Sequence, residues 1–126
     1  MRLPIFPPGS PVTGIVTNLY DLLQAQSGTL SERDVRNLVF HRAEIDLRVL
    51  SLEIPARLID CLGLSPEPEG TNRLSPVRVM IDGRLGTIQP FRGSGELLVI
   101  GHITLTALGL MLDKDGNLVD DPFPAR

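Results

Sequence analysis

The chain has few aromatic residues and almost no cysteine. Its 126 residues include four phenylalanines, one tyrosine, no tryptophan and a single cysteine, Cys61. Aromatic residues account for 4% of the chain and hydrophobic residues for 42%, so we expect a core built from Leu, Ile and Val. One cysteine excludes an internal disulfide. Because Cys61 lies in an apolar stretch, we interpret it as a packing residue.

Basic clusters and long apolar runs are missing as well. The net charge is −3, and the 12 Lys and Arg residues are scattered among 15 Asp and Glu residues, which disfavours nucleic-acid binding. Residues 1–8 contain too short an apolar run and too many prolines for a signal peptide or a membrane span. We therefore expect a cytoplasmic protein with no nucleic-acid partner and no direct membrane insertion.

The chain lacks the motifs of metal and cofactor chemistry. The side chains that could bind a metal, His41, His102 and Cys61, do not occur at ligand spacing. Residues 113–117 resemble the acidic start of a calcium-binding loop. Pro124 stands where the bidentate glutamate of such a loop belongs, so a hairpin turn is the better interpretation. We expect neither a metal nor a cofactor.

The length of the chain fits a single domain. Residues 1–11 contain four prolines, which fix the backbone angle φ and remove hydrogen-bond donors. They predict an extended arm that is available to contact a partner. Residues 12–121 are predicted to form one β-rich domain, and residues 122–126 a C-terminal tail.

Alternating apolar residues and turn signals predict many short strands. The Asp82-Gly83 pair lies between two alternating runs and indicates a hairpin, and Asp115-Gly116 marks a second, smaller one. Residues 12–23 favour a strand, with a helix over residues 18–25 as the alternative. The predicted strands cover residues 12–23, 35–46, 49–53, 77–81, 84–88, 96–100, 110–113 and 117–119.

Two short helices are predicted, one in each half of the chain. Proline is tolerated at a first helical position, so Pro55 opens a helix that Gly63 ends. Residues 102–108 have helical spacing before Gly109, and we interpret Gly101 as meeting a backbone requirement at a strand-to-helix corner. Many short strands with so little helix predict an all-β fold, a small antiparallel barrel, and argue against a doubly wound α/β sheet.

Two stretches of the chain follow the order of motifs of a known family. In the first, Ala43-Glu44-Ile45-Asp46-Leu47-Arg48 is followed by residues 49–55 and by a helix that ends in Leu62-Gly63-Leu64. In the second, residues 97–102 read Leu-Leu-Val-Ile-Gly-His and precede another helix. This order resembles that of the retropepsin-like (retroviral-type) aspartic proteases. Residues 27–36 are similar to an insertion in their small bacterial members, and the resemblance spans residues 12–119.

The resemblance implies a retropepsin-like barrel with Asp46 at the position of the catalytic aspartate. It also implies a homodimer, because each chain of such a protease supplies one aspartate. Leu47 and Arg48 replace the threonine and the glycine that follow the aspartate in the family. The threonine hydroxyl links two active-site loops and the glycine permits a close backbone turn, so both supports are lost. The family's Ala-Asp-Gly flap signature is also missing from residues 70–74.

The guanidinium of Arg48 bears on the chemistry of Asp46. An arginine beside a carboxylate stabilises its ionised form and lowers its pKa. Two aspartates that share one proton need the opposite, because one of them must stay protonated to act as a general acid. If Arg48 points toward Asp46, the two are predicted to form a salt bridge rather than half of a catalytic dyad. Two solvated charges at a strand end are the alternative.

The leading hypothesis is a non-catalytic retropepsin-like domain, a degenerate protease that acts as a protein-binding or assembly module within a larger complex. The expected partner is a second copy or another protein, bound through sheet edges and the Pro-rich arm. The alternative is an active dimeric aspartic peptidase that uses Asp46 from each chain. A small-molecule-binding β domain is a third hypothesis, for which no residue indicates a ligand.

Overall fold

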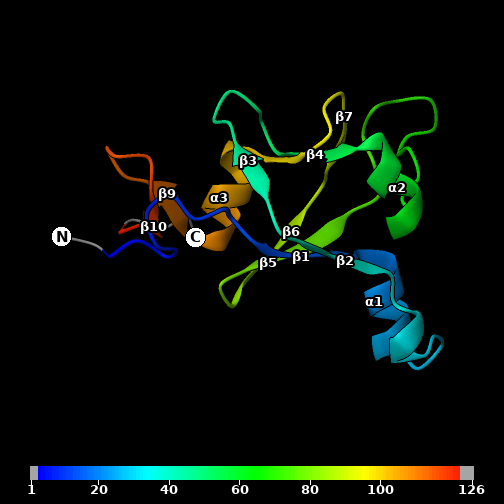
Figure 1. Ribbon diagram of the computed structural model, residues 1–126. Helices are drawn as coiled ribbons and strands as arrows, with labels where there is room; N and C mark the ends of the chain where they lie inside the picture. Colours follow the sequence, from blue (N-terminus) through cyan, green and yellow to red (C-terminus); the bar gives the residue numbers. More distant parts are fainter. Residues whose placement is uncertain (1–2, 123–126) are drawn as a thin grey trace.

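A computed structural model describes residues 3–122, which form three α-helices, one 3-10 helix and ten strands (Figure 1). The first half of the chain contains β1 (Gly14–Asn18), α1 (Leu19–Gln26), the 3-10 helix η1 (Glu32–Asp34), β2 (Asn37–Phe40), β3 (Ala43–Ile45), β4 (Leu52–Pro55) and α2 (Ala56–Leu62). The second half contains β5 (Val77–Ile81), β6 (Arg84–Ile88), β7 (Phe91–Gly93), β8 (Leu98–Ile100), α3 (His102–Leu108), β9 (Leu110–Leu112) and β10 (Leu118–Asp120).

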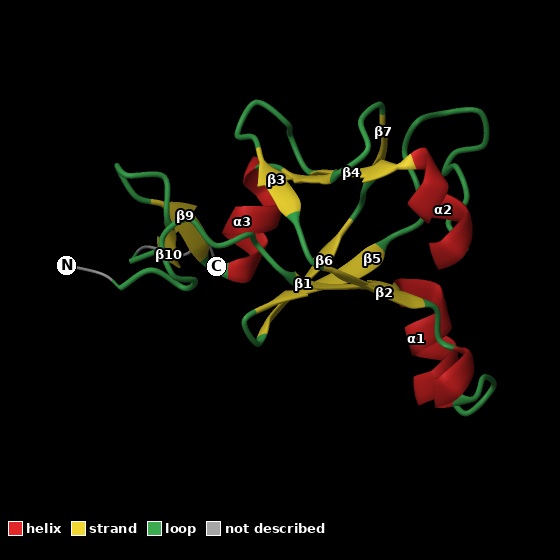
Figure 2. Cartoon of the chain, in the orientation of Figure 1, coloured by secondary structure: helices red, strands yellow, loops and turns green. Residues whose placement is uncertain are grey.

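The strands form three separate sheets. One has the order β2-β1-β5-β6 and is antiparallel throughout, and β9 and β10 form a small antiparallel sheet of their own. The other has the order β3-β8-β4-β7, in which β8 runs parallel to β3 and antiparallel to β4. Figure 2 shows β4, α2 and α3 on one side of the β2-β1-β5-β6 sheet and α1 on the other.

The expected all-β antiparallel barrel is wrong. The fold is mixed α/β, since three helices accompany sheets that do not close on one another in the described chain. Two strand pairs, β3 with β8 and β4 with β7, are parallel. Parallel neighbours need long connections between them, and here those connections contain helices and hairpins. The pattern of residues within each strand does not show which distant strand it will pair with.

Two predicted long strands are each divided. The run 12–23 ends as a strand at Asn18, whose side-chain oxygen accepts a hydrogen bond from the Asp21 N–H at 3.1 Å and so caps α1. The alternative of a helix over residues 18–25 was therefore close to the observed α1. The run 35–46 is interrupted at His41 and Arg42, and its two parts, β2 and β3, belong to different sheets.

The turn and helix-end predictions are confirmed. Asp82 and Gly83 both have positive φ, at 51° and 77°, as a two-residue hairpin requires, and they join β5 to β6. Helix α2 begins directly after Pro55 and ends at Gly63, and α3 lies between Gly101 and Gly109. The predicted small hairpin of β9 and β10 is present as well.

The N-terminal arm lies along β10. The Ile5 N–H donates to the Leu118 carbonyl at 2.8 Å, and Ile5 and Phe6 pack against the core. The described part of the arm thus contacts its own chain rather than projecting from it. Residues 1–2 of the predicted arm and residues 123–126 of the predicted tail lie outside the described residues.

The core is aliphatic, as its composition predicted. It lies between the two larger sheets and is closed by α2 and α3; its most deeply buried side chains are Val16, Leu52, Ile54, Leu62, Leu74, Val77, Val79, Ile81 and Ile100. Cys61 is not among them. The prediction that it packs inside is wrong, because α2 turns Cys61 to the exposed side and buries its neighbour Leu62.

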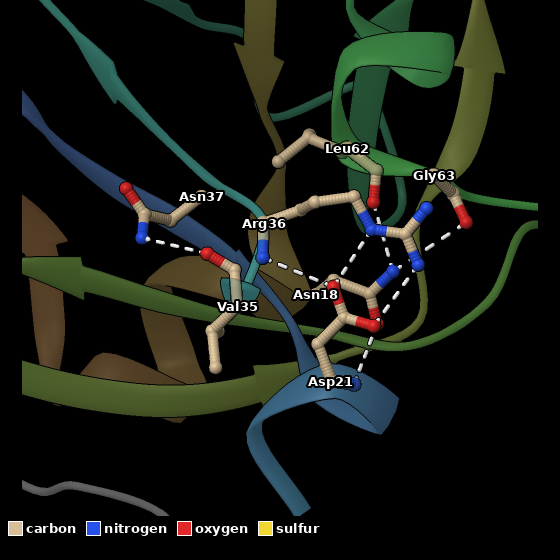
Figure 3. Close-up of polar contacts among 7 residues, drawn as sticks. All are labelled: Asn18, Asp21, Val35, Arg36, Asn37, Leu62 and Gly63. Atoms are coloured by element: carbon tan, nitrogen blue, oxygen red, sulfur yellow. Dashed lines mark hydrogen bonds and ion pairs between the residues drawn. The ribbon is translucent and has the colours of Figure 1, made fainter. Parts of the chain in front are cut away.

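An ion pair between a buried carboxylate and a half-exposed guanidinium joins α1 to the chain before β2 (Figure 3). Both oxygens of Asp21 accept from the Arg36 guanidinium, at 2.7 and 2.9 Å, and Asp21 is 5% exposed. The Asn18 amide donates to the Leu62 carbonyl at 2.8 Å and ties the start of α1 to the end of α2. Arg36 holds the pKa of the Asp21 carboxyl below its usual value, mainly through their hydrogen bonds.

We predict that Asp21→Asn lowers the free energy of unfolding at neutral pH by roughly 1–2 kcal/mol, because the partly buried hydrogen bonds from Arg36 lose their charged acceptor. The depressed pKa gives the parent a stability that is full above the unfolded pKa of aspartate and is lost as the pH falls through the lower folded pKa. Urea unfolding across this range should therefore show the gap between parent and variant closing in acid. The exposed Asp60, changed to Asn, is the control, and a gap independent of pH would contradict the prediction.

Candidate functional site

Asp46 follows β3 and lies beside the end of the central strand β8. Its N–H donates to the Ile100 carbonyl at 3.1 Å, which continues the pairing of β3 with β8 by one residue. The Asp46 carbonyl accepts from the Val49 N–H at 3.0 Å, so the chain turns back directly after the aspartate. The loop 46–51 then leads into β4, on the other side of β8.

The loop 46–51 caps helix α3 through its backbone carbonyls. The carbonyl of Val49 accepts from the N–H of residue 102 at 3.0 Å, and that of Leu50 from residue 103 at 2.8 Å. The Ser51 carbonyl accepts from the N–H of residue 101, directly before the helix, at 2.7 Å. The buried hydroxyl of Thr104 also donates to the Ser51 carbonyl, at 2.9 Å. The first N–H groups of a helix have no partner within it, and here the site loop supplies those partners.

Gly101 allows this close contact. A Cβ atom at this position would overlap the backbone carbonyls of Val49 and Ser51, the latter at 2.5 Å. Its φ of −98° is open to any residue, so the requirement is for space rather than for an unusual backbone angle. The interpretation of Gly101 as a backbone requirement at a strand-to-helix corner is confirmed, and the carbonyls of the site loop are its cause.

Arg48 folds back onto Asp46 and engages both carboxylate oxygens. The Arg48 Nε and backbone N–H each donate to Asp46 Oδ1 at 3.0 Å, and the Arg48 Nη2 donates to Oδ2 at 3.0 Å. These hydrogen bonds, with the attraction between the charges, hold the pKa of the Asp46 carboxyl below its usual value. The salt bridge between Asp46 and Arg48 is therefore present, and it is a surface pair, since the Arg48 side chain is 91% exposed and remains solvated.

The pairing with Arg48 favours the ionised form of Asp46. A carboxylate that accepts a two-pronged guanidinium is stabilised in its ionised form, and its lone pairs are occupied on the side that Arg48 covers. Leu47, beside it, is exposed and carries no hydroxyl. The chain thus places at this position a carboxylate whose pKa lies below its usual value, paired with an exposed guanidinium.

Comparison of the chain with family models, with curated proteins and with solved structures finds no match. The likeness to retropepsin-like proteases therefore remains a resemblance carried by the motifs quoted above.

An apolar surface surrounds the site loop, and sequence reasoning missed it. Leu50 is 64% exposed and Ile103, at the start of α3, is 43% exposed. Leu50 and Phe91 together line two open depressions, of about 380 and 280 Å³. A guanidinium borders each one, Arg73 the first and Arg92 the second, and within residues 3–122 neither pairs with a carboxylate.

In the described part of the chain, the other sequence candidates form no metal site, although the backbone of His102 bonds to the site loop at Val49. Among residues 3–122, no three His, Cys, Asp or Glu side chains come close enough together to hold a metal ion. Asp113 accepts the N–H groups of Asp115 and Asn117, both at 2.9 Å, which is the hairpin that was preferred to a calcium loop. None of the helices in the described chain is long and apolar enough to cross a membrane.

We predict that Gly101→Ala destabilises the protein by about 2–4 kcal/mol, because the new methyl group must displace backbone rather than a flexible side chain. Thermal or urea unfolding measures the loss. Gly95→Ala is the matched control, since nothing lies within 4 Å of a Cβ at Gly95. Equal stability of the two variants would show that the site loop does not press against Gly101.

Proposed function

We propose that this chain is a non-catalytic domain of retropepsin-like type that acts as a protein-binding or assembly module in a larger complex. The observation that carries the proposal is the hold of Arg48 on Asp46. The family's aspartate has to share a proton with its counterpart across a dimer, and an aspartate paired with a guanidinium on both oxygens is poorly placed to do so.

Two similar units in the chain support the resemblance. In the first unit β4 leads directly into α2, which ends at Gly63, and in the second β8 leads through Gly101 into α3, which ends at Gly109. Both terminal glycines adopt the left-handed conformation, with φ of 66° and 71°. Strands β4 and β8 are neighbours in one sheet. The loop that contains Asp46 leads into β4 and bonds to the start of α3.

The surface around the broken motif supports a binding role. The side chains of Leu47, Leu50 and Ile103 expose apolar area to water. Burial of that area against a partner would be favourable, because it removes apolar surface from water. Arg73 and Arg92 border the same area without a carboxylate partner in the described chain. We therefore expect a protein partner with aliphatic and acidic side chains, met in the cytoplasm, where the exposed thiol of Cys61 would stay reduced.

A peptidase assay tests the non-catalytic half of the proposal. We expect that a mixture of unstructured peptides, incubated with the chain between about pH 3 and pH 6 where aspartate dyads work, remains uncleaved. Asp46→Asn should give the same result as the parent. Cleavage by the parent that disappears in Asp46→Asn would overturn the proposal in favour of the dimeric peptidase.

The size of the chain in its native extract tests the assembly half. A tagged full chain, expressed in the cells that naturally contain it, is expected to elute from a sizing column well above the mass of one copy. Leu50→Asp would place a carboxylate on the apolar surface and should weaken any assembly formed there. Elution of the parent as a free monomer in the extract would contradict the assembly function.

A further inference from the structure

An apolar row crosses the outer face of the β2-β1-β5-β6 sheet. The strand register places one apolar side chain from each strand beside the next, in the order Val39, Ile15, Met80 and Leu85. These side chains point away from the core, because the alternate positions of the same strands, such as Val16 and Val79, are fully buried on the inner face. The two ends of the row remain open, with Val39 50% exposed and Leu85 52% exposed.

Strand β2 is an edge of this sheet, and its outward backbone groups have no partner. The Asn18 N–H donates to the Arg36 carbonyl at 2.9 Å, so every second residue from Arg36 onward bonds to β1. The N–H and C=O groups of Asn37 and Val39 therefore point away from β1, and within residues 3–122 no other group bonds to them. The strand also contains no charge and no proline, the usual protections of an exposed edge.

Opposite charges lie at the two ends of β2. Asp34 precedes the strand by three residues and Arg42 follows it by two, and both side chains are exposed. Within the described chain neither makes an ion pair, whereas the intervening Arg36 is neutralised by Asp21. An antiparallel copy of β2 would bring its own Arg42 to the Asp34 end and its own Asp34 to the Arg42 end.

We propose that two copies of this chain associate through their β2 edges, antiparallel and related by a two-fold axis. The free backbone groups of Asn37 in each copy pair with those of Val39 in the other, so Leu38 lies at the axis and the two Val39 side chains are diagonal neighbours across it. In this register Asp34 of each copy lies near Arg42 of the other. The inference goes beyond the proposed function, because the β2 edge is a different surface from that of Leu50 and Ile103 and its partner is a second copy of the chain. Because β2 is only four residues long, the dimer is expected to be weak, with a dissociation constant on the order of micromolar.

A matched pair of substitutions tests which part of the sheet associates. Val39 and Leu85 lie at opposite ends of the same row with nearly equal exposure, so Val39→Lys and Leu85→Lys change the surface alike. In sedimentation of the purified full chain, we expect a dimer whose dissociation constant rises roughly tenfold or more in Val39→Lys, because the two lysines become diagonal neighbours across the axis in place of two valines. Leu85→Lys should leave it unchanged. A parent that stays monomeric at high micromolar concentration, or equal effects of the two variants, would overturn the inference.

A charge exchange tests the antiparallel orientation. Asp34→Arg and Arg42→Asp should each weaken the dimer, and the double variant should restore it, since the attraction is then re-formed with its signs reversed. A double variant as weak as the single ones would overturn this orientation. The result is separate from the proposed function. If Val39→Lys leaves the dimer unchanged while the chain still elutes in a large native complex, only the β2 interface is refuted. If the chain cleaves peptides, only the non-catalytic function is refuted.

Discussion

The contact between the site loop and the start of α3 is the constraint on which the rest of the site depends. Three carbonyls of residues 49–51 satisfy the first N–H groups of α3, and Gly101 lets the two backbones approach without a side chain between them. This contact fixes the loop against the end of β8 and leaves little room for the chain between Asp46 and Val49. The short turn that results brings Arg48 back onto Asp46 and turns Leu50 outward.

The loop 46–51 holds α3 through its backbone. The contacts come from the carbonyls of residues 49–51, so they do not depend on the side chains of residues 46–48. Arg48 then satisfies Asp46 within its own loop, where a catalytic aspartate would need a counterpart from a second chain. Leu47 and Leu50 are both exposed on this loop, and exposed apolar side chains of this kind are typical of binding surfaces.

The local features of the fold could be predicted from the sequence, whereas the grouping of strands could not. Asp82-Gly83, Pro55 and Gly63 act through backbone angles that a residue type determines by itself, and each predicted turn or helix end is observed. The division of residues 35–46 into two strands of different sheets depends on packing between distant segments, which alternation does not encode. Cys61 was misplaced for a related reason, because an apolar stretch in a helix has an exposed side as well as a buried one.

At the site, the sequence indicated that Asp46 and Arg48 could form a salt bridge, with two solvated charges as the alternative, but it did not show which residues surround them. A carboxylate and a guanidinium two residues apart indicated the pair of Asp46 and Arg48, since a tight turn is enough to bring them together. The apolar surface at Leu50 and Ile103 joins residues far apart in the chain and could not be found without the contact of the loop with α3. The open edge at β2 likewise appears only once the order of strands is known.

The pKa of Asp46 in the folded chain is the most direct measurement of whether Arg48 keeps this carboxylate ionised. Titration of its side-chain carboxyl carbon by NMR should give a value below the ordinary value of about 3.9, because Arg48 stabilises the carboxylate. Arg48→Gln should move the value back toward the ordinary one. An Asp46 pKa at or above the ordinary value in the parent would show that the guanidinium does not hold the carboxylate, and would contradict the proposed non-catalytic function.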